Sequence, residues 1–214
     1  MVRCDRGRCP REHPQDTPAR AQNRRNMKRP TRASPLAPTW LVGEKVRLRA
    51  IEPTDVPMLL RWFNESPART WLMTRLPLSR NAEQEWAARA AVSPGTPTFV
   101  VQTKTGEDIG VAGLTLFGAR AELGIALHES RRWNGGYGTD AVRTLVDGAF
   151  RALPLQRIEL FVYPDNVRAI RCYEKAGFAR EGVLRGREYR KGRYDDVAIM
   201  SILHEEWAQA RTDG

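Results

Sequence analysis

The stretch from Asn166 to Phe178 reads NVRAIRCYEKAGF and decides more about the fold than any other part of the chain. Asn166 follows a proline-containing break and is a good N-cap residue, and Gly177 is a good residue to end a helix. The pattern therefore predicts a helix over residues 166–176, followed directly by a strand. Tyr173 comes seven residues after Asn166, about two helical turns, so both side chains are expected on one helix face.

A glycine-rich stretch lies upstream, where Trp133 to Thr139 reads WNGGYGT. Apolar residues at helical spacing follow it over residues 141–150, so the loop leads into the start of a helix. Glycines let a backbone approach a ligand closely, and the first N–H groups of a helix have no partner within the helix. Because the helix dipole adds partial positive charge there, the sequence predicts an anion site, ideally for a pyrophosphate.

Three kinds of phosphate site have to be weighed for this loop. A Walker-type P-loop is excluded because the stretch lacks the Gly-Lys-Ser/Thr ending. A dinucleotide-binding turn fits better, since Gly136 to Ala141 matches Gly-x-Gly-x-x-Ala and Glu159 follows at about the expected distance. That turn should follow its strand directly, however, whereas residues 128–134 intervene here. The third is a site for coenzyme A pyrophosphate, which is favoured by the family resemblance that this loop and the motif at residues 166–178 carry together, as given below.

Patterns in the rest of the chain predict one domain that mixes helices and strands. Alternating or continuous apolar runs predict strands, and caps followed by apolar residues at helical spacing predict helices. The expected strands cover residues 46–51, 98–102, 109–116, 121–127, 157–162, 179–184 and 194–203, and the expected helices cover residues 54–66, 79–91, 141–150 and 166–176, with a short one near Trp207. The order is β-α-α-β-β-β-α-β-α-β-β, which indicates an α/β or α+β domain.

Charge is concentrated in a leader that precedes this domain. Residues 1–38 hold ten Lys or Arg and three Asp or Glu, a net +7 of the chain's +10, together with six prolines and no apolar periodicity. Such a segment buries too little apolar surface to offset its ordering entropy. We therefore expect a disordered basic Pro/Arg-rich leader before a domain over residues 39–214. A solvated tail, or translation from Met27, is favoured over a basic arm that contacts RNA.

The chain has 214 residues, enough for one domain with a substantial core. It contains no apolar run near the ~18 residues that a membrane span needs and no apolar N-terminal signal, so a transmembrane or exported protein is not expected. Three cysteines make no disulfide framework, which suits a reducing cytoplasm. Cys4, Cys9 and His13 do not form a recognisable set of four ligands, so no metal site is expected.

The two motifs together resemble those of the GNAT superfamily of N-acetyltransferases, and the resemblance covers roughly Trp40 to Trp207. The stretch that begins at Trp133 is similar to the family's Arg/Gln-x-x-Gly-x-Gly/Ala loop, with a tryptophan where Arg or Gln is usual. This variant, and the ending from Lys191 to Ser201, look like the branch that contains ribosomal-protein alanine and spermidine N-acetyltransferases. The resemblance implies a GNAT-like fold with a central mixed, mostly antiparallel sheet flanked by helices.

The resemblance also implies a role for each matching residue. Acetyl-CoA would be held by the backbone of the glycine-rich loop, by the end of the preceding strand, which pairs with the pantetheine arm, and by Asn166. These cofactor-binding residues are Ala126, Leu127, Trp133, Asn134, Gly135, Gly136, Tyr137, Gly138, Thr139 and Asn166. Tyr173 would donate a proton to the departing CoA thiolate, for which a phenol is a suitable acid.

Attack of an amine on a thioester also needs a base that removes a proton from the amine. Glu122, on an expected strand, is our candidate, acting directly or through water, although such a carboxylate can equally be a residue of the strand surface. His128 follows that strand and is better interpreted as a loop residue. Cys172 could suggest an acyl-enzyme, yet it neighbours Tyr173 on the helix and so points about 100° away, which favours a buried structural thiol.

These observations predict an acetyl-CoA-dependent N-acetyltransferase that moves the acetyl group directly to a primary amine in a ternary complex. The acceptor stays open between a protein N-terminus, a polyamine and another small amine. The alternative is a non-catalytic CoA-binding module, or one tethered to nucleic acid by the basic leader. We expect a cytoplasmic protein that uses no metal, membrane or nucleic acid, and the resemblance further implies a capacity to form homodimers.

Overall fold

The computed structural model describes residues 39–73, 76–93 and 95–212, so the expected leader over residues 1–38 lies outside the described part. The described residues all belong to the compact unit Pro35–Gly214. Within them, eight strands form one sheet in the order β1-β2-β3-β4-β5-β6-β8-β7. The strands are β1 Thr39–Val42, β2 Val46–Ala50, β3 Thr98–Thr103, β4 Asp108–Phe117, β5 Arg120–Leu127, β6 Arg157–Val162, β7 Ala179–Arg190 and β8 Arg193–Leu203.

The helices follow the predicted order with a few additions. They are α1 Val56–Glu65, α2 Arg80–Val92, α3 Tyr137–Ala152, α4 Val167–Lys175 and α5 His204–Thr212, with short 3-10 helices η1 Pro53–Asp55, η2 Pro67–Trp71 and η3 Ser130–Arg132. The sequence patterns did not predict β1, because four residues are too few to show an alternation. The first α-helix begins at Val56 rather than at Thr54, because the residues before it form a 3-10 turn.

Local capping signals set the helix ends as expected. Ser79 Oγ accepts the backbone N–H of Ala82 at 3.2 Å, and Asn166 Oδ1 accepts that of Ala169 at 3.3 Å. Gly177 follows α4 with φ +97°, a left-handed conformation that glycine adopts without strain. Each N-cap of this kind is worth ~1 kcal/mol of helix stability.

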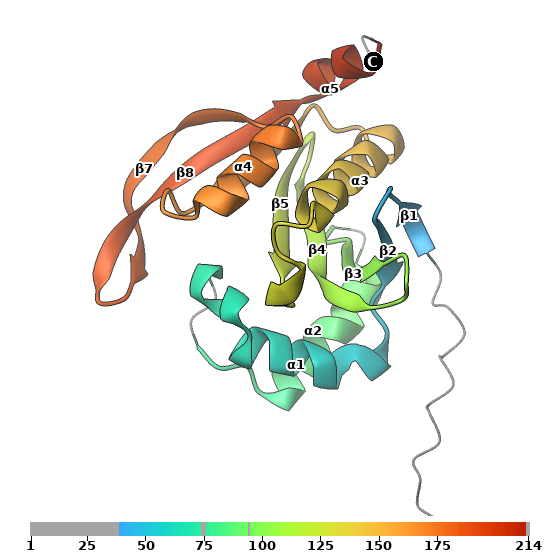
Figure 1. The fold of residues 1–214 in the computed structure, drawn as a ribbon, viewed down its shortest axis with the longest axis vertical. Coiled ribbons are helices and arrows are strands. Elements are labelled where there is room, and N and C mark those ends of the chain that lie inside the picture. Colours follow the sequence, from blue (N-terminus) through green and yellow to red (C-terminus); the bar gives the residue numbers. More distant parts are fainter. Residues whose placement is uncertain (1–38, 74–75, 94, 213–214) are drawn as a thin grey trace, which may run out of the picture. The chain divides into compact units, whose positions relative to one another are not determined.

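The sheet is mixed and mostly antiparallel, and helices cover both of its faces (Figure 1). α3 and α4 pack on one face, where Leu145 of α3 shares a core with Leu123 of β5 and Ile158 of β6. α1 and α2 pack on the other face, where Leu59 of α1 shares a second core with Val111 of β4. The β7–β8 hairpin projects from the sheet beyond α4.

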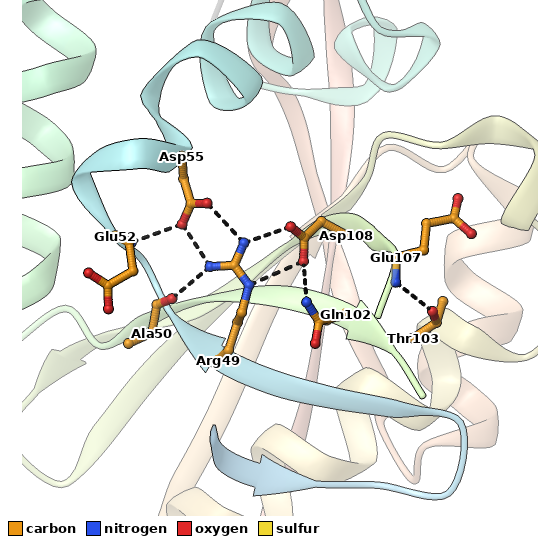
Figure 2. A network of polar contacts seen from close by, with 8 residues as sticks. All are labelled: Arg49, Ala50, Glu52, Asp55, Gln102, Thr103, Glu107 and Asp108. Atoms are coloured by element: carbon orange, nitrogen blue, oxygen red, sulfur yellow. Dashed lines mark hydrogen bonds and ion pairs between the residues drawn. The ribbon is translucent and has the colours of Figure 1, made fainter. Parts of the chain in front are cut away.

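A buried arginine fixes the start of α1 against the sheet (Figure 2). Arg49 on β2 donates from two nitrogens to Asp55, at 2.7 and 2.9 Å, and reaches Asp108 at the start of β4 at 2.7 Å. Gln102 donates to the same Asp108 carboxylate at 2.9 Å, and Asp55 also accepts the N–H of Glu52 at 2.8 Å. These contacts connect the start of α1 to β2 and β4. Removal of one partner would leave an uncompensated buried charge and so destabilise the fold.

The parallel pair β5–β6 is the part of the sheet that creates the site. The two strands run parallel because α3 lies between them in the chain and supplies the crossover. Their pairing covers Arg120–Glu122 of β5 and Arg157–Glu159 of β6. Beyond Glu122 the two strands no longer pair, so the backbone groups along one edge of each strand face the opening between them.

Candidate active site

A cleft of about 900 Å³ lies where β5 and β6 diverge. β5 from Glu122 to Leu127 forms one wall, and the end of β6 from Phe161 to Tyr163 forms another together with α4. The start of α3 lines the cleft from one face of the sheet, and η2 lines it from the other face. The cleft therefore passes between the two strands and is lined from both faces of the sheet.

The structure brings together most of the predicted site residues. Those that line the cleft are Glu122, Ala126, Leu127, Trp133, Asn134, Gly136, Gly138, Thr139, Asn166 and Tyr173. Gly135 and Tyr137 are not among the described lining residues: the Gly135 carbonyl accepts a hydrogen bond from Lys45 Nζ at 2.9 Å, and Tyr137 packs partly against the main core. The individual roles of all these residues stay predictions.

The glycine-rich loop ends in a helix start whose backbone donors carry no side-chain cap. Gly136 is the N-cap residue of α3 and adopts φ +81°. Asn134 also has a positive φ, +61°, which asparagine tolerates. A Cβ on Gly138 would come within 3.3 Å of Cys172 Sγ, so this position also favours glycine. The backbone of the loop can thus approach an anion closely and donate N–H groups to it.

Asp140 in the first turn of α3 does not occupy these donors. Its carboxylate instead accepts the backbone N–H groups of Glu44, Lys45 and Val46, at 3.1, 2.8 and 2.9 Å. This latch ties the β1–β2 turn to the start of α3 and so supports the loop. The sequence analysis missed it, because its partners are main-chain groups that no side-chain pattern reveals.

Basic side chains surround the same part of the cleft. The basic lining residues are Lys45, Arg132, Arg143, Arg168, Arg171 and Lys175. We name these six side chains and the loop over residues 133–139 the basic end. Their positive potential favours a ligand that carries several phosphate charges. The glycine cradle and this rim together fit the phosphates of a coenzyme A derivative.

Trp133 has a structural role that explains the departure from the usual Arg or Gln. Its Nε1 donates to the Leu127 carbonyl at 2.8 Å, which ties the loop to the end of β5, and the Arg168 guanidinium lies 3.6 Å from the ring centroid. Just before it, Arg132 binds the Glu107 carboxylate through Nε at 3.0 Å. Hydrogen bonding to Arg132 lowers the pKa of that carboxyl, so the anchor is ionised at neutral pH.

Tyr173 and Asn166 both line the cleft from α4, as their spacing predicts. Asn166 is buried and serves as the cap of the helix. Tyr173 is only 8% exposed, and burial raises the pKa of its hydroxyl above the usual range. The hydroxyl therefore stays protonated at neutral pH, which is the state that a proton donor needs.

Cys172 corrects one expectation. It was expected to be a buried thiol that points away from Tyr173, but it is half-buried and lines the cleft beside the start of α3. Thr139 Oγ1 donates to its Sγ at 3.5 Å. Burial raises the pKa of the thiol, so little thiolate is present at neutral pH. The predicted full burial of Cys172 is therefore wrong, while the chemistry of its thiol still does not favour an acyl-enzyme.

Glu122 reaches the cleft from the opposite face of the sheet. It lies across from Thr115 of β4, on the face that carries α1 and α2, whereas Tyr173 lies on the face of α3 and α4. Its side chain is half-buried, and within the described residues it has no hydrogen-bond or ion-pair partner. An unengaged carboxylate of this kind can accept a proton from an amine, directly or through water.

The part of the cleft at Glu122 is aromatic. Phe63 of α1, Trp71 of η2 and the β6 region residues Phe161 and Tyr163 line it together with Glu122 and Gly124, and we name this set the aromatic end. A Cβ on Gly124 would meet nothing within 4 Å, so the strand leaves open space there.

His128 and Trp62 belong to the core under α1 instead. Their rings stack at 5.1 Å with an interplanar angle of 5°, and Phe63 packs edge-on against His128 at 5.2 Å. His128 Nδ1 lies 2.7 Å from Ser66 Oγ. Burial lowers the pKa of His128 to about 4, so the ring is a neutral packing element and does not line the cleft.

In the described part of the chain, no group of three or more His, Cys, Asp or Glu side chains is arranged to hold a metal ion. None of the helices in that part combines the length and the apolar character that a membrane crossing requires.

Comparison with known proteins assigns the family. Residues 45–179 match the acetyltransferase (GNAT) domain, so the chain belongs to the GNAT acetyltransferase family. It is an N-acetyltransferase, and acetyl-CoA is the acetyl donor that this family uses. The fold class and the family predicted from the two sequence motifs are confirmed, and the non-catalytic alternative is not supported.

Several relatives show how widely acceptors vary around this chain. It is 29% identical over 175 residues to the uncharacterized N-acetyltransferase p20 of Bacillus licheniformis, which covers 78% of this chain and 98% of that protein. It is 31% identical over 158 residues to an aminoglycoside N(6')-acetyltransferase type 1 of Klebsiella pneumoniae, covering 66% and 78%. The solved spermidine N-acetyltransferase of Vibrio cholerae with CoA and spermine matches with a TM-score of 0.71 and 25% identity, covering 77% and 98%.

Proposed function

We propose that the chain transfers the acetyl group of acetyl-CoA directly to a primary amine within a ternary complex. The observation that carries this proposal is the cleft that passes through the sheet, with the basic end on one face and the aromatic end on the other. Two substrates can enter from opposite sides and meet between Tyr173 and Glu122. Such mutual positioning replaces an encounter in solution and supplies much of the rate.

Bound acetyl-CoA supplies an acetyl group activated as a thioester. N–H groups at the start of α3 and the basic side chains bind its phosphates, while the edge of β5 beyond Glu122 offers backbone groups to the pantetheine arm. Glu122 takes a proton from the amine as nitrogen bonds to the carbonyl carbon. The Tyr173 hydroxyl gives its proton to sulfur as the C–S bond breaks, and it regains a proton from solvent.

Initial-rate kinetics test direct transfer. Thiol release is measured while acetyl-CoA and an accepted amine are varied together. We expect intersecting lines, because both substrates must be bound before product leaves, and Cys172→Ala should stay largely active. Parallel lines, or an acetyl group trapped on Cys172, would establish an acyl-enzyme instead.

Glu122→Gln tests the base and has a matched control in Glu44→Gln, which changes a cleft carboxylate at the basic end. We expect a loss of ~100-fold in kcat/KM at pH 7 for Glu122→Gln, as is typical for a general base. The loss should shrink as the pH approaches the pKa of the amine, because a larger fraction of the amine is then already neutral and depends less on a base. An equal and pH-independent loss in both variants would remove Glu122 from the mechanism.

We further propose that the protein works in the cytoplasm and forms a homodimer. The free thiol of Cys172 supports a reducing compartment. β7 is an edge strand with exposed apolar side chains, Val183 at 54% and Leu184 at 39%, and such an edge favours pairing with another chain. Light scattering at micromolar concentration tests the dimer, and a monomeric mass there would contradict it.

A further inference from the structure

The aromatic end carries little negative charge. Among the described residues, the carboxylates that line the cleft are Glu44, Glu122 and Asp140. Asp140 is occupied by three backbone N–H groups, and Glu44 lies beside Lys45 at the basic end. Glu122 is therefore the one carboxylate that the described lining offers to a ligand at the aromatic end.

Three of the four aromatic rings at the aromatic end already have an arginine near one face. The Arg190 guanidinium lies 3.9 Å from the ring centroid of Tyr163 and 5.5 Å from that of Trp71, and the Arg187 guanidinium lies 3.8 Å from that of Phe161. A ring face attracts a ligand cation through its quadrupole only where it is free. These arginines therefore reduce the capacity of the aromatic end for a second positive charge.

Arg190 also binds two carboxylates that lie outside the described lining of the cleft. It binds Asp165 and Asp195, each at 2.7 Å, and Asp195 binds Arg193 at 2.7 Å as well. Hydrogen bonding to Arg190, and then to Arg193, lowers the pKa of Asp195. Both carboxylates are thus already paired within the protein.

Apolar surface makes up most of the remaining lining on this side. Phe63, Ala68 and Leu72 line the cleft from α1 and η2 and the residue after it. Gly113 and Gly124 lie opposite each other on β4 and β5; the space beside Gly113 is filled by Pro97 and Thr98, whereas that beside Gly124 is open. An apolar group fits this space and gains free energy from burial.

We propose that the acceptor is a primary amine with a single positive charge on an apolar or aromatic body, and neither a polyamine nor an aminoglycoside. The amine lies at Glu122 and the body packs at the aromatic end. A second cation buried there without a counter-charge is costly, whereas an apolar body is favoured. This inference rests on the proposed amine acetylation. A free alkylamine and a peptide N-terminus with an apolar first side chain share this chemistry.

Matched amines test the proposal by kcat/KM from thiol release. Hexylamine and 1,6-diaminohexane have the same chain length and differ in one charge, and we expect hexylamine to be preferred at least tenfold. The pair phenylalaninamide and lysinamide repeats the test for peptide-like acceptors. Comparing hexylamine with phenylalaninamide then distinguishes a free alkylamine from a peptide N-terminus. Preference for the diamine, spermidine or kanamycin would overturn the proposal. If acetyl-CoA binds and none of these amines is acetylated, the proposed function fails and the proposal fails with it.

A charge placed at Gly124 provides an independent test, because a side chain there meets open space. Gly124→Asp adds a carboxylate at the aromatic end, and Gly124→Asn is the uncharged control of the same size. We expect the diaminohexane-to-hexylamine ratio of kcat/KM to be about tenfold higher in the Asp variant, since opposite charges attract strongly in a cleft. Equal ratios in two folded variants would overturn the charge argument, and if neither variant folds, the wild-type comparison still decides.

Discussion

Tyr173 combines near-complete burial with a place on the wall of the cleft. Tyr173→Phe removes only the hydroxyl, so packing and CoA affinity should survive. We expect kcat to fall ~100-fold with little change in KM, because the proton is needed only as the thiolate departs. If the hydroxyl merely stabilised the fold, the melting temperature would fall by the equivalent of ~1 kcal/mol while kcat stayed near normal. Measuring both on the same variant separates the two cases.

His128 should make the fold sensitive to acid. Its pKa of about 4 in the folded chain lies below the ordinary 6.5, so between these values the unfolded chain binds the proton more strongly. The resulting stability is complete above about pH 6.5 and is lost as the pH falls toward 4. From pH 8 to pH 5 the wild type should lose about 2 kcal/mol more than His128→Phe, which keeps an aromatic ring but does not titrate.

Urea denaturation of both proteins across this pH range checks the His128 prediction. Above pH 7, where the ring at position 128 is neutral in both proteins, their free energies of unfolding should differ by a constant amount. Below pH 7 the value for the wild type should fall faster. Curves that run parallel down to pH 5 would show that His128 does not control the acid sensitivity.

At the scale of elements, local signals could be predicted and long-range ones could not. The caps at Ser79 and Asn166 act within one helical turn, so the sequence shows them directly. The divergence of β5 from β6 depends on two strands that are separated by the whole of α3. No local pattern encodes where their pairing stops. The loop and Tyr173 could be predicted as site residues because each lies in a compact motif, whereas the latch of Asp140 could not.

The start of α3 gives a prediction with a closely matched control. Gly136 and Gly192 have nearly the same positive φ, +81° and +82°, so alanine causes similar backbone strain at both positions. Gly136 lines the cleft, whereas Gly192 lies in the β7–β8 turn. Gly136→Ala should weaken CoA binding at least tenfold, because the added methyl group narrows the approach of phosphate to the backbone and lies 3.1 Å from Lys45 Nζ, a contact that Gly192→Ala does not make.

Calorimetric titration with CoA measures the affinities of the two glycine variants, and thermal melts compare their stabilities. Gly192→Ala should lower the melting temperature by a similar amount and leave the CoA affinity within twofold of wild type. A similar loss of affinity in both variants would mean that strain, and not the loop, determines binding.

At the scale of the whole molecule, the net charge of the chain does not indicate the charge inside the cleft. The chain carries +10, yet residues 1–34 hold ten Lys or Arg and three Asp or Glu, which leaves +3 for residues 35–214. Within the cleft, the charge that a ligand meets depends on which carboxylates are already paired. Asp140 lines the cleft and counts as negative in the composition, but backbone N–H groups already bind its carboxylate. Composition therefore does not show which charges in the cleft are already paired, because that pairing is made between distant segments.

A chain that begins at Pro35 tests whether the leader contributes to catalysis. The compact unit begins at this residue, and all described site residues follow it. We expect the shortened chain to keep kcat/KM within twofold and to show the same CoA-induced rise in melting temperature, because ligand binding stabilises only the folded unit. Its retention on heparin should fall, since most of the net positive charge is removed. A tenfold loss of kcat/KM, with the melting temperature unchanged, would instead make the leader part of the enzyme.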